Sequence, residues 1–546
     1  MARIQESEGA VAGKKWTLLA VILGSGIVFL DSTIVPVALP RIGRELPTLF
    51  LDTLEGQSYV YYGYLLSLSA FLILAGALND YYGRRRLFAI GLAGFGATSA
   101  LCGLAPNMEL LVLGRVLQGL AGAILVPGAL SIITATFDGE EQGRAFGIWA
   151  GASAATTILG PLIGGALVAS VSWRAAFLIN LPLVVWALWA TLTHMRETRD
   201  EEASGGFDWL GAVLVAVAVG GLTFGAIRGQ AQEWRDPVAY VSLAAGLVAA
   251  VAFVPAMART QHPLVPLELF RSRNFTVTNI STLLIYGAIY VSVQFSALFL
   301  IGVLRYNEVG FGLATIPSDI FLALFSARFG KLADRYGPRV FMALGPAIMG
   351  LGLLWFTRIP ADSAPWRFEL GGGIVPPTDV WVDVVAAFTV FGLGLMIMVA
   401  PLTAALMRSV PVRHSGVASA FNNAISRVGP QLAGALLFIA ISSTFYASLH
   451  TSLPGADPAS LRERVNPLNA VSQSDEALAQ AARSASTDAF HLAAFVSAAM
   501  CFAGAAVNAV GIRNPTRKEE EPGERRQAVT PCPEAPPLER GVVQGG

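Results

Sequence analysis

The stretch Gly76-Ala-Leu-Asn-Asp-Tyr-Tyr-Gly-Arg-Arg-Arg86 is a compact polar turn between two apolar runs, each long enough to cross a bilayer. A second copy, Gly330-Lys-Leu-Ala-Asp-Arg-Tyr-Gly-Pro-Arg339, keeps the two glycines, the leucine, the aspartate, a tyrosine and an arginine in the same register. A polar turn repeated in the same relation to its flanking apolar runs indicates that the chain has two related halves.

Composition places the chain among membrane proteins. Its 546 residues are 54% hydrophobic and only 14% charged, with 56 glycines and a mean hydropathy of +0.59. These values are typical of a polytopic membrane protein and exclude an ordinary soluble one. The formal net charge is zero, which gives no case for nucleic-acid binding. Cys102, Cys501 and Cys532 lack metal-type spacing, so neither a metal site nor a disulfide framework is indicated.

Apolar runs predict an all-α protein with about fourteen spanning helices, at roughly 20 residues per span. The first run, from Trp16, lacks a convincing cleavage site and is expected to stay as a helix. The two turns follow the second and tenth spans, which suggests two pseudo-symmetric six-helix halves with an extra helix pair between them. The expected parts are residues 1–193 (first half), 194–274 (linker with two additional helices), 275–512 (second half) and 513–546 (disordered cytoplasmic tail, rich in Pro, Glu and Arg).

Arginine and lysine are more frequent in the loops on the side of the Gly76 turn than in the short loops opposite. The positive-inside rule therefore places both repeated turns and both termini in the cytoplasm. The stretches Pro360–Asp379 and Ala447–Asp488 are expected to be long polar loops on the outside.

Asp31 lies about fifteen residues into the first predicted span, well past the membrane interface at about 1.5 Å per residue. Ionisable groups inside spans are costly and usually functional, and a carboxyl group there can take up and release a proton. The alternative is a purely structural aspartate that is hydrogen-bonded by Ser32, by Thr33 or by the backbone of a proline-bent helix end.

Arg115, in the fourth predicted span, is the expected partner of Asp31. Its guanidinium stays charged in proteins, so it cannot carry the proton, but it can act on a nearby carboxylate or polarise Gln118. The alternative is that Arg115 only fixes helix packing.

A second repeated element is Gly160-Pro161-Leu-Ile-Gly164-Gly165, matched by Gly429-Pro430-Gln-Leu-Ala433-Gly434. Proline bends a helix and small residues allow close helix approach, so these runs predict two bent helices at an interface. Asp319 follows Pro317 in the tenth span and is either a second proton or cation site or an interface residue. The candidates for a substrate cavity or helix interface are Gln118, Gly160, Pro161, Asp319, Asn422 and Arg427.

In the repeated turns, an aspartate can bind helix N-terminal amides and pair with arginine, which would hold two elements together until something competes. The alternative is a solvated hairpin with snorkelling arginines. The candidates for this cytoplasmic gate are Gly76, Asp80, Gly83, Arg84, Asp334, Arg335 and Gly337.

The turn resembles the signature loop of the major facilitator superfamily. Leu30–Pro40, Arg115–Gly122 and Gly160–Gly165 are similar to motifs of its drug:proton antiporters, and Trp173–Pro182 and Pro263–Phe270 resemble the fourteen-helix branch. The match runs from about Trp16 to Tyr446. Four residues depart from the usual motifs, which bears on substrate and coupling more than on fold: Pro36, Tyr59, Asn79 and Thr156.

The resemblance implies an exporter of amphiphilic or cationic small molecules that works by alternating access and is driven by the proton gradient, with Asp31 and Arg115 as the coupling residues. It also implies a multi-pass protein of the cell inner (plasma) membrane that acts as a monomer, without cofactor or metal. The alternatives are export of one endogenous metabolite or peptide, uptake of a nutrient, and a non-transporting sensor or scaffold. An enzyme is not expected, because the five histidines are scattered and form no cluster.

Overall fold

The computed structural model describes residues 2–49, 53–199, 207–232, 234–368, 375–453, 461, 465, 467–468 and 476–514. All of these residues except Asn514 belong to one compact unit. Every regular element of the described residues is a helix, and no strand occurs among them. The predicted all-α class is therefore confirmed.

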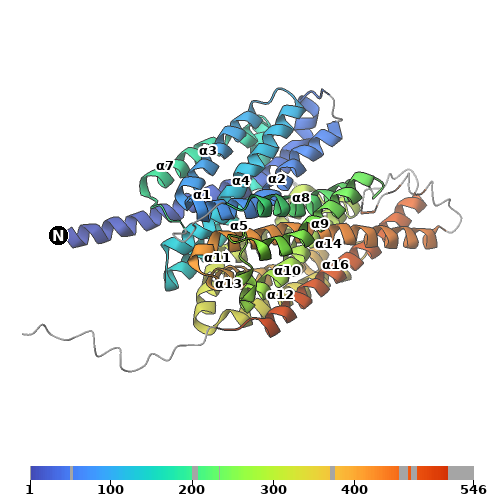
Figure 1. Cartoon of the computed structure of the whole chain (residues 1–546). Helices are drawn as coiled ribbons and strands as arrows, with labels where there is room; N and C mark the ends of the chain where they lie inside the picture. The colour runs from blue at the N-terminus through green and yellow to red at the C-terminus, as the bar shows by residue number, and fades with distance from the viewer. Residues whose placement is uncertain are drawn as a thin grey trace, which may run out of the picture. The chain divides into compact units, whose positions relative to one another are not determined.

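The helices follow the predicted spans in their order along the chain (Figure 1). The α-helices are α1 (Ala2–Glu45), α2 (Thr53–Tyr82), α3 (Arg84–Gly103), α4 (Met108–Thr136), α5 (Gly139–Ser170), α6 (Ala175–Leu178), α7 (Asn180–His194), α8 (Trp209–Ala231), α9 (Pro237–Arg259), α10 (Arg273–Ala297), α11 (Glu308–Tyr336), α12 (Pro338–Trp355), α13 (Ala386–Arg408), α14 (Ser415–Ser452) and α16 (Glu476–Gly511). Short 3₁₀ or π segments are η1 (Leu267–Arg271), η2 (Leu298–Val303), η3 (Phe356–Arg358), η4 (Val380–Val385) and η5 (Val412–His414).

Thirteen helical segments of the described residues are long and apolar enough to cross a membrane. The fifth span predicted from the sequence, Gly143–Val171, is not among these thirteen but coincides with the continuous helix α5.

The two repeated turns are reduced to one residue each. Gly83 separates α2 from α3 with a φ of 106°, and Gly337 separates α11 from α12 with a φ of 88°. Side chains with a Cβ rarely adopt this conformation, so glycine is required for so sharp a reversal. The duplicated glycines thus explain why both copies form the same helix-to-helix corner.

The inserted pair, α8 and α9, packs together, and α8 also contacts α2 and α14. Arg228 of α8 donates a 2.8 Å hydrogen bond to the Tyr59 hydroxyl of α2 and pairs with Asp236 at 2.5 Å. The inserted helix α8 therefore contacts one helix of each predicted half, α2 of the first and α14 of the second. The division into two six-helix halves stays a prediction.

One predicted loop is partly helical. Within Ala447–Asp488, α14 continues to Ser452 and α16 already begins at Glu476. The start of α16 is rich in alanine and buries Leu478, Ala481, Ala482 and Ala485, which is helical spacing. A search for apolar spans does not detect an amphipathic helix of this kind. Most of the predicted tail and residues 200–206 of the linker lie outside the described residues.

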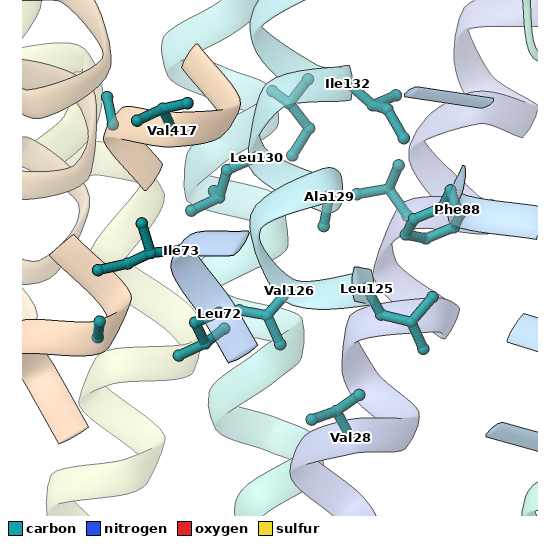
Figure 2. Close-up of a cluster of buried hydrophobic side chains, with 14 of the residues drawn as sticks. Val28, Leu72, Ile73, Phe88, Leu125, Val126, Ala129, Leu130, Ile132 and Val417 are labelled. Carbon is teal, nitrogen blue, oxygen red and sulfur yellow. The ribbon is translucent and has the colours of Figure 1, made fainter. Parts of the chain in front are cut away.

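The core near the first turn joins helices from distant parts of the chain. Val126 of α4 lies between Val28 of α1 and Ile73 of α2 in Figure 2, and Leu125 and Ala129 of the same helix belong to the same buried cluster. Val417, at the start of α14, belongs to the same buried cluster. The end of α2 and the start of α14 therefore share one hydrophobic contact zone.

Candidate functional site

Asp31 and Arg115 form an ion pair inside the helix bundle. Arg115 Nη1 of α4 lies 2.5 Å from Asp31 Oδ2 of α1, and both side chains have no exposed surface. A buried charge is tolerated when it is paired and hydrogen-bonded. The structure thus brings together the two residues that the sequence predicted as partners.

Other contacts fix the guanidinium of Arg115. Its Nε donates a 2.9 Å hydrogen bond to the carbonyl of Val60 in α2. The group also lies over the ring of Tyr64, 4.1 Å from its centroid, which is cation–π geometry. Arg115 therefore links α1, α2 and α4, while its Nη2 has no hydrogen-bond partner among the described residues.

Two side-chain amides complete the surroundings of Asp31. Gln118 donates to Asp31 Oδ1 at 3.1 Å and accepts from Arg115 at 2.7 Å. Asn180 donates to the same Oδ1 at 3.2 Å, and both amides also donate to the hydroxyl of Ser99. All of these side chains are fully buried. The carboxylate thus has a charged donor, Arg115, on Oδ2 and two neutral donors, Gln118 and Asn180, on Oδ1.

Ser99 and Asn180 were not predicted as site residues. Asn180 lies in the Trp173–Pro182 motif, and the helix break at Ile179 between α6 and α7 makes it the first residue of α7. That motif was the available signal for Asn180. Ser99 is a single small polar residue in a predicted span, and nothing in its position along the sequence marks it as a site residue.

At the first repeated turn, Asp80 connects to the start of α14. Its Oδ1 accepts from Arg84 Nε at 3.0 Å and Nη2 at 2.8 Å, and its Oδ2 accepts from the Val417 amide at 3.0 Å. Arg84 also donates to the carbonyl of Val412 at 2.8 Å. Asp80 and Arg84 are buried. A carboxylate at a helix N-terminus is stabilised by the helix dipole, so this contact joins two helices far apart in sequence.

The glycines of this turn allow the close approach. A Cβ added at Gly76 would lie 2.5 Å from the carbonyl oxygen of Gly416. At Gly83 an added Cβ would lie 2.8 Å from the carboxylate of Glu197, which accepts from the amides of Arg85 and Arg86 at 3.0 and 3.1 Å. The segment after α7 therefore caps the N-terminus of α3.

In the second turn, Asp334 pairs with Arg408 of α13 at 2.5 Å. The guanidinium of Arg335 lies over the ring of Tyr336, 5.5 Å from its centroid. Adjacent residues of a helix point to different faces, so Asp334 and Arg335 contact different neighbours. Asp334 approaches Gly143 of α5, and its Oδ2 has no hydrogen-bond partner among the described residues.

The remaining candidates separate by their surroundings. Gly160 packs directly against Thr33 of α1, while the side chain of Pro161 lies outside the described residues. Asn422 of α14 donates to Asn279 at 3.0 Å and Thr282 at 2.9 Å of α10, so it lies at a helix interface. Neither Asp319 nor Arg427, both half-buried, has a hydrogen bond or ion pair within the described part of the chain.

Comparisons with known proteins agree with this architecture. The family model for the Major Facilitator Superfamily matches residues 21–435. The tetracenomycin C resistance and export protein of Streptomyces glaucescens is 34% identical over 432 residues, which are 79% of this chain and 77% of that protein. The multidrug resistance protein Stp of Mycobacterium tuberculosis (strain CDC 1551 / Oshkosh) is 31% identical over 450 residues, 82% of this chain and 80% of that protein.

Solved structures show the same fold. The proton:xylose symporter XylE bound to 6-bromo-6-deoxy-D-glucose has a TM-score of 0.56 at 12% identity, and the match covers 91% of this chain and 95% of that one. The human organic anion transporter MFSD10 (TETRAN) has a TM-score of 0.54 at 14% identity, with 89% and 99% covered.

Proposed function

This chain belongs to the Major Facilitator Superfamily, and from that membership we propose that it exports amphiphilic or cationic small molecules in exchange for protons. It is a multi-pass membrane transporter and not an enzyme. Its relatives support export, since their names include tetracenomycin C resistance and export, multidrug resistance and methylenomycin A resistance. The names do not favour a sensor or scaffold.

The observation that carries the proton-coupled part is the ion pair between Asp31 and Arg115, fully buried in the bundle. Of its two members, only Asp31 can take up and release a proton, because an arginine guanidinium stays charged in proteins. Substrate enters from the cytoplasm or inner leaflet while Asp31 is ionised, and its release outside is coupled to proton uptake by Asp31. Binding sites of such transporters lie near the bilayer midplane between the repeats.

Asn180 supports a two-state role for this site. Its amide nitrogen donates to the ionised Asp31, and its Oδ1 has no hydrogen-bond partner among the described residues. If the amide turns over, that oxygen can accept the proton of a neutral carboxyl group. Asn180 would thereby hydrogen-bond Asp31 in both its ionised and its neutral form.

The first repeated turn serves as the gate in this proposal. Asp80 and Arg84 hold the start of α14 while the cytoplasmic side is closed, and the contact breaks when that side opens. The second turn, with Asp334 and Arg408, forms a weaker counterpart. Both turns and both termini face the cytoplasm, and the transporter acts as a monomer in the plasma membrane, without a cofactor and driven by the proton gradient.

Uptake into inverted membrane vesicles tests the proposal. The vesicles are offered a panel of lipophilic compounds. We expect an inside-acid proton gradient to drive the uptake of several of them, and a protonophore to abolish this uptake. Vesicles without the protein are the control. If the proton gradient does not change the uptake of any compound in the panel, broad proton-coupled export is contradicted and a narrow metabolite substrate is favoured.

A further inference from the structure

Arg427 is an arginine inside a membrane helix without a visible counter-charge. It lies on α14 about 18 Å beyond Ser415, at about 1.5 Å per residue, and is half-buried. No carboxylate pairs with it among the described residues, and its buried Nε has no hydrogen-bond partner there. Intramembrane arginines are rare, and they usually face a partner or a transport pathway.

Two tyrosines of α2 lie within electrostatic range of Arg427. Arg427 is close enough to interact electrostatically with Tyr61 and Tyr64 of α2, and Tyr61 interacts likewise with Tyr290 of α10. Helix α14 packs against both α2 and α10. Arg427 thus lies where a helix of the first predicted half meets two helices of the second.

Among the described residues, the charges around Arg115 and Arg427 leave the positive charge of Arg427 without a paired carboxylate. Asp31 neutralises Arg115 at 2.5 Å, and Arg115 also acts on Tyr61 and Tyr64. Arg427 adds a second guanidinium near the same tyrosines. In a low-dielectric region this arrangement attracts an anion, and a guanidinium can bind a carboxylate or phenolate through two parallel hydrogen bonds.

A purely structural role does not account for Arg427. The contact between α14 and α10 is already made by Asn422 with Asn279 and Thr282, and by Gly429 against Leu283. Arg427 adds no hydrogen bond to this contact among the described residues. A packing residue at this position would not need a charge that is costly to hold in a membrane.

We propose that Arg427, together with Tyr61, binds the acidic oxygen group of aromatic anionic substrates. The guanidinium takes the carboxylate or phenolate, and the tyrosine ring packs against the aromatic body of the compound. This inference rests on the proposed function and adds acidic aromatic compounds to the substrates of the transporter.

Binding of two related dyes to the purified full-length protein tests this. Fluorescein carries a carboxylate and a phenolate, whereas rhodamine 123 has the same ring system as a cation, and fluorescence anisotropy reports the binding of each. For Arg427→Gln we expect at least about tenfold weaker fluorescein binding, as for the loss of a charged hydrogen-bond donor, with rhodamine 123 binding unchanged or tighter. The fluorescein affinity of Arg427→Lys should lie between those of the wild type and Arg427→Gln. Lysine keeps the positive charge but cannot make the two parallel hydrogen bonds of a guanidinium.

Arg358→Gln is the matched control, because Arg358 is exposed and stacks on Trp355 at 5.4 Å. It removes the same charge and should leave both dyes unaffected. Retained rhodamine 123 binding by Arg427→Gln shows that this variant is folded. Wild-type protein that fails to bind fluorescein, or an Arg427→Gln variant that binds it with wild-type affinity, would overturn the proposal.

Vesicle transport separates this inference from the proposed function. If wild-type protein exports rhodamine 123 with the proton gradient but does not bind fluorescein, export stands and the role of Arg427 fails. If fluorescein binds through Arg427 but neither dye moves with the gradient, the binding site stands and proton-coupled export is contradicted.

Discussion

Asp80 Oδ2, at the end of α2, accepts a 3.0 Å hydrogen bond from the main-chain amide of Val417, at the start of α14. These residues are 337 positions apart in the chain. The same carboxylate binds the buried guanidinium of Arg84. One side chain therefore connects the first signature turn to a helix of the other predicted half.

The two copies of the turn should be unequal. Asp80→Ala leaves Arg84, 2% exposed, without its carboxylate, and breaking a buried pair costs about 3–5 kcal/mol. Asp334→Ala removes a pair whose arginine side chain is 39% exposed, which is worth about 0–1 kcal/mol. In an efflux assay at matched expression we expect Asp80→Ala to lower transport at least about tenfold and Asp334→Ala several-fold less. Equal losses would refute this asymmetry.

Gly76→Ala should hinder closure of the gate. The added methyl group would meet the carbonyl of Gly416 at 2.5 Å and the Cβ of Ala420. Such overpacking costs about 1–3 kcal/mol, so we expect the closed state to lose population about tenfold or more. Cysteine accessibility at the cytoplasmic face, with and without the substitution, measures this.

Gly312→Ala is the control for Gly76→Ala, since an added Cβ there meets nothing within 4 Å. Unchanged accessibility in Gly76→Ala would show that the approach of α2 to α14 is not what closes the transporter.

Much of the architecture could be predicted from the sequence. The duplicated turn and the lengths of the apolar runs gave the helix order, because spanning helices need long apolar segments. The start of α16 was missed because its Leu478 and Ala482 form only one apolar stripe on an amphipathic helix. Length and hydropathy do not record such a stripe.

The site was predicted in part. Asp31 and Arg115 were recognisable because charges in spans are rare, and the structure places them in contact. Ser99 and Asn180 contribute neutral side chains, whose meaning depends on which helices become neighbours. The pairing of Asp334 with Arg408 also depends on tertiary contact, since the two residues lie on α11 and α13. The roles of these residues in transport stay predictions.

Arg115→Lys should impair transport although it preserves charge. Arginine donates to Asp31 and Gln118 through Nη1 and to the Val60 carbonyl through Nε, which a single ammonium group cannot reproduce. Loss of one charge-assisted hydrogen bond corresponds to about 1.5–3 kcal/mol. We therefore expect proton-driven uptake to fall about tenfold or more, measured beside Arg358→Lys as the exposed control. A wild-type rate in Arg115→Lys would mean that only the charge of Arg115 matters.

The most direct test of the account follows protons moved by substrate. Wild-type protein and Asp31→Asn are reconstituted into liposomes without a pH gradient, the best panel substrate is added outside, and a trapped dye reports lumenal pH. Asparagine has nearly the shape of aspartate but cannot carry the proton. We predict that substrate entry makes the lumen alkaline with wild-type protein and leaves its pH unchanged with Asp31→Asn. Alkalinisation by Asp31→Asn at the wild-type rate would contradict proton coupling through Asp31.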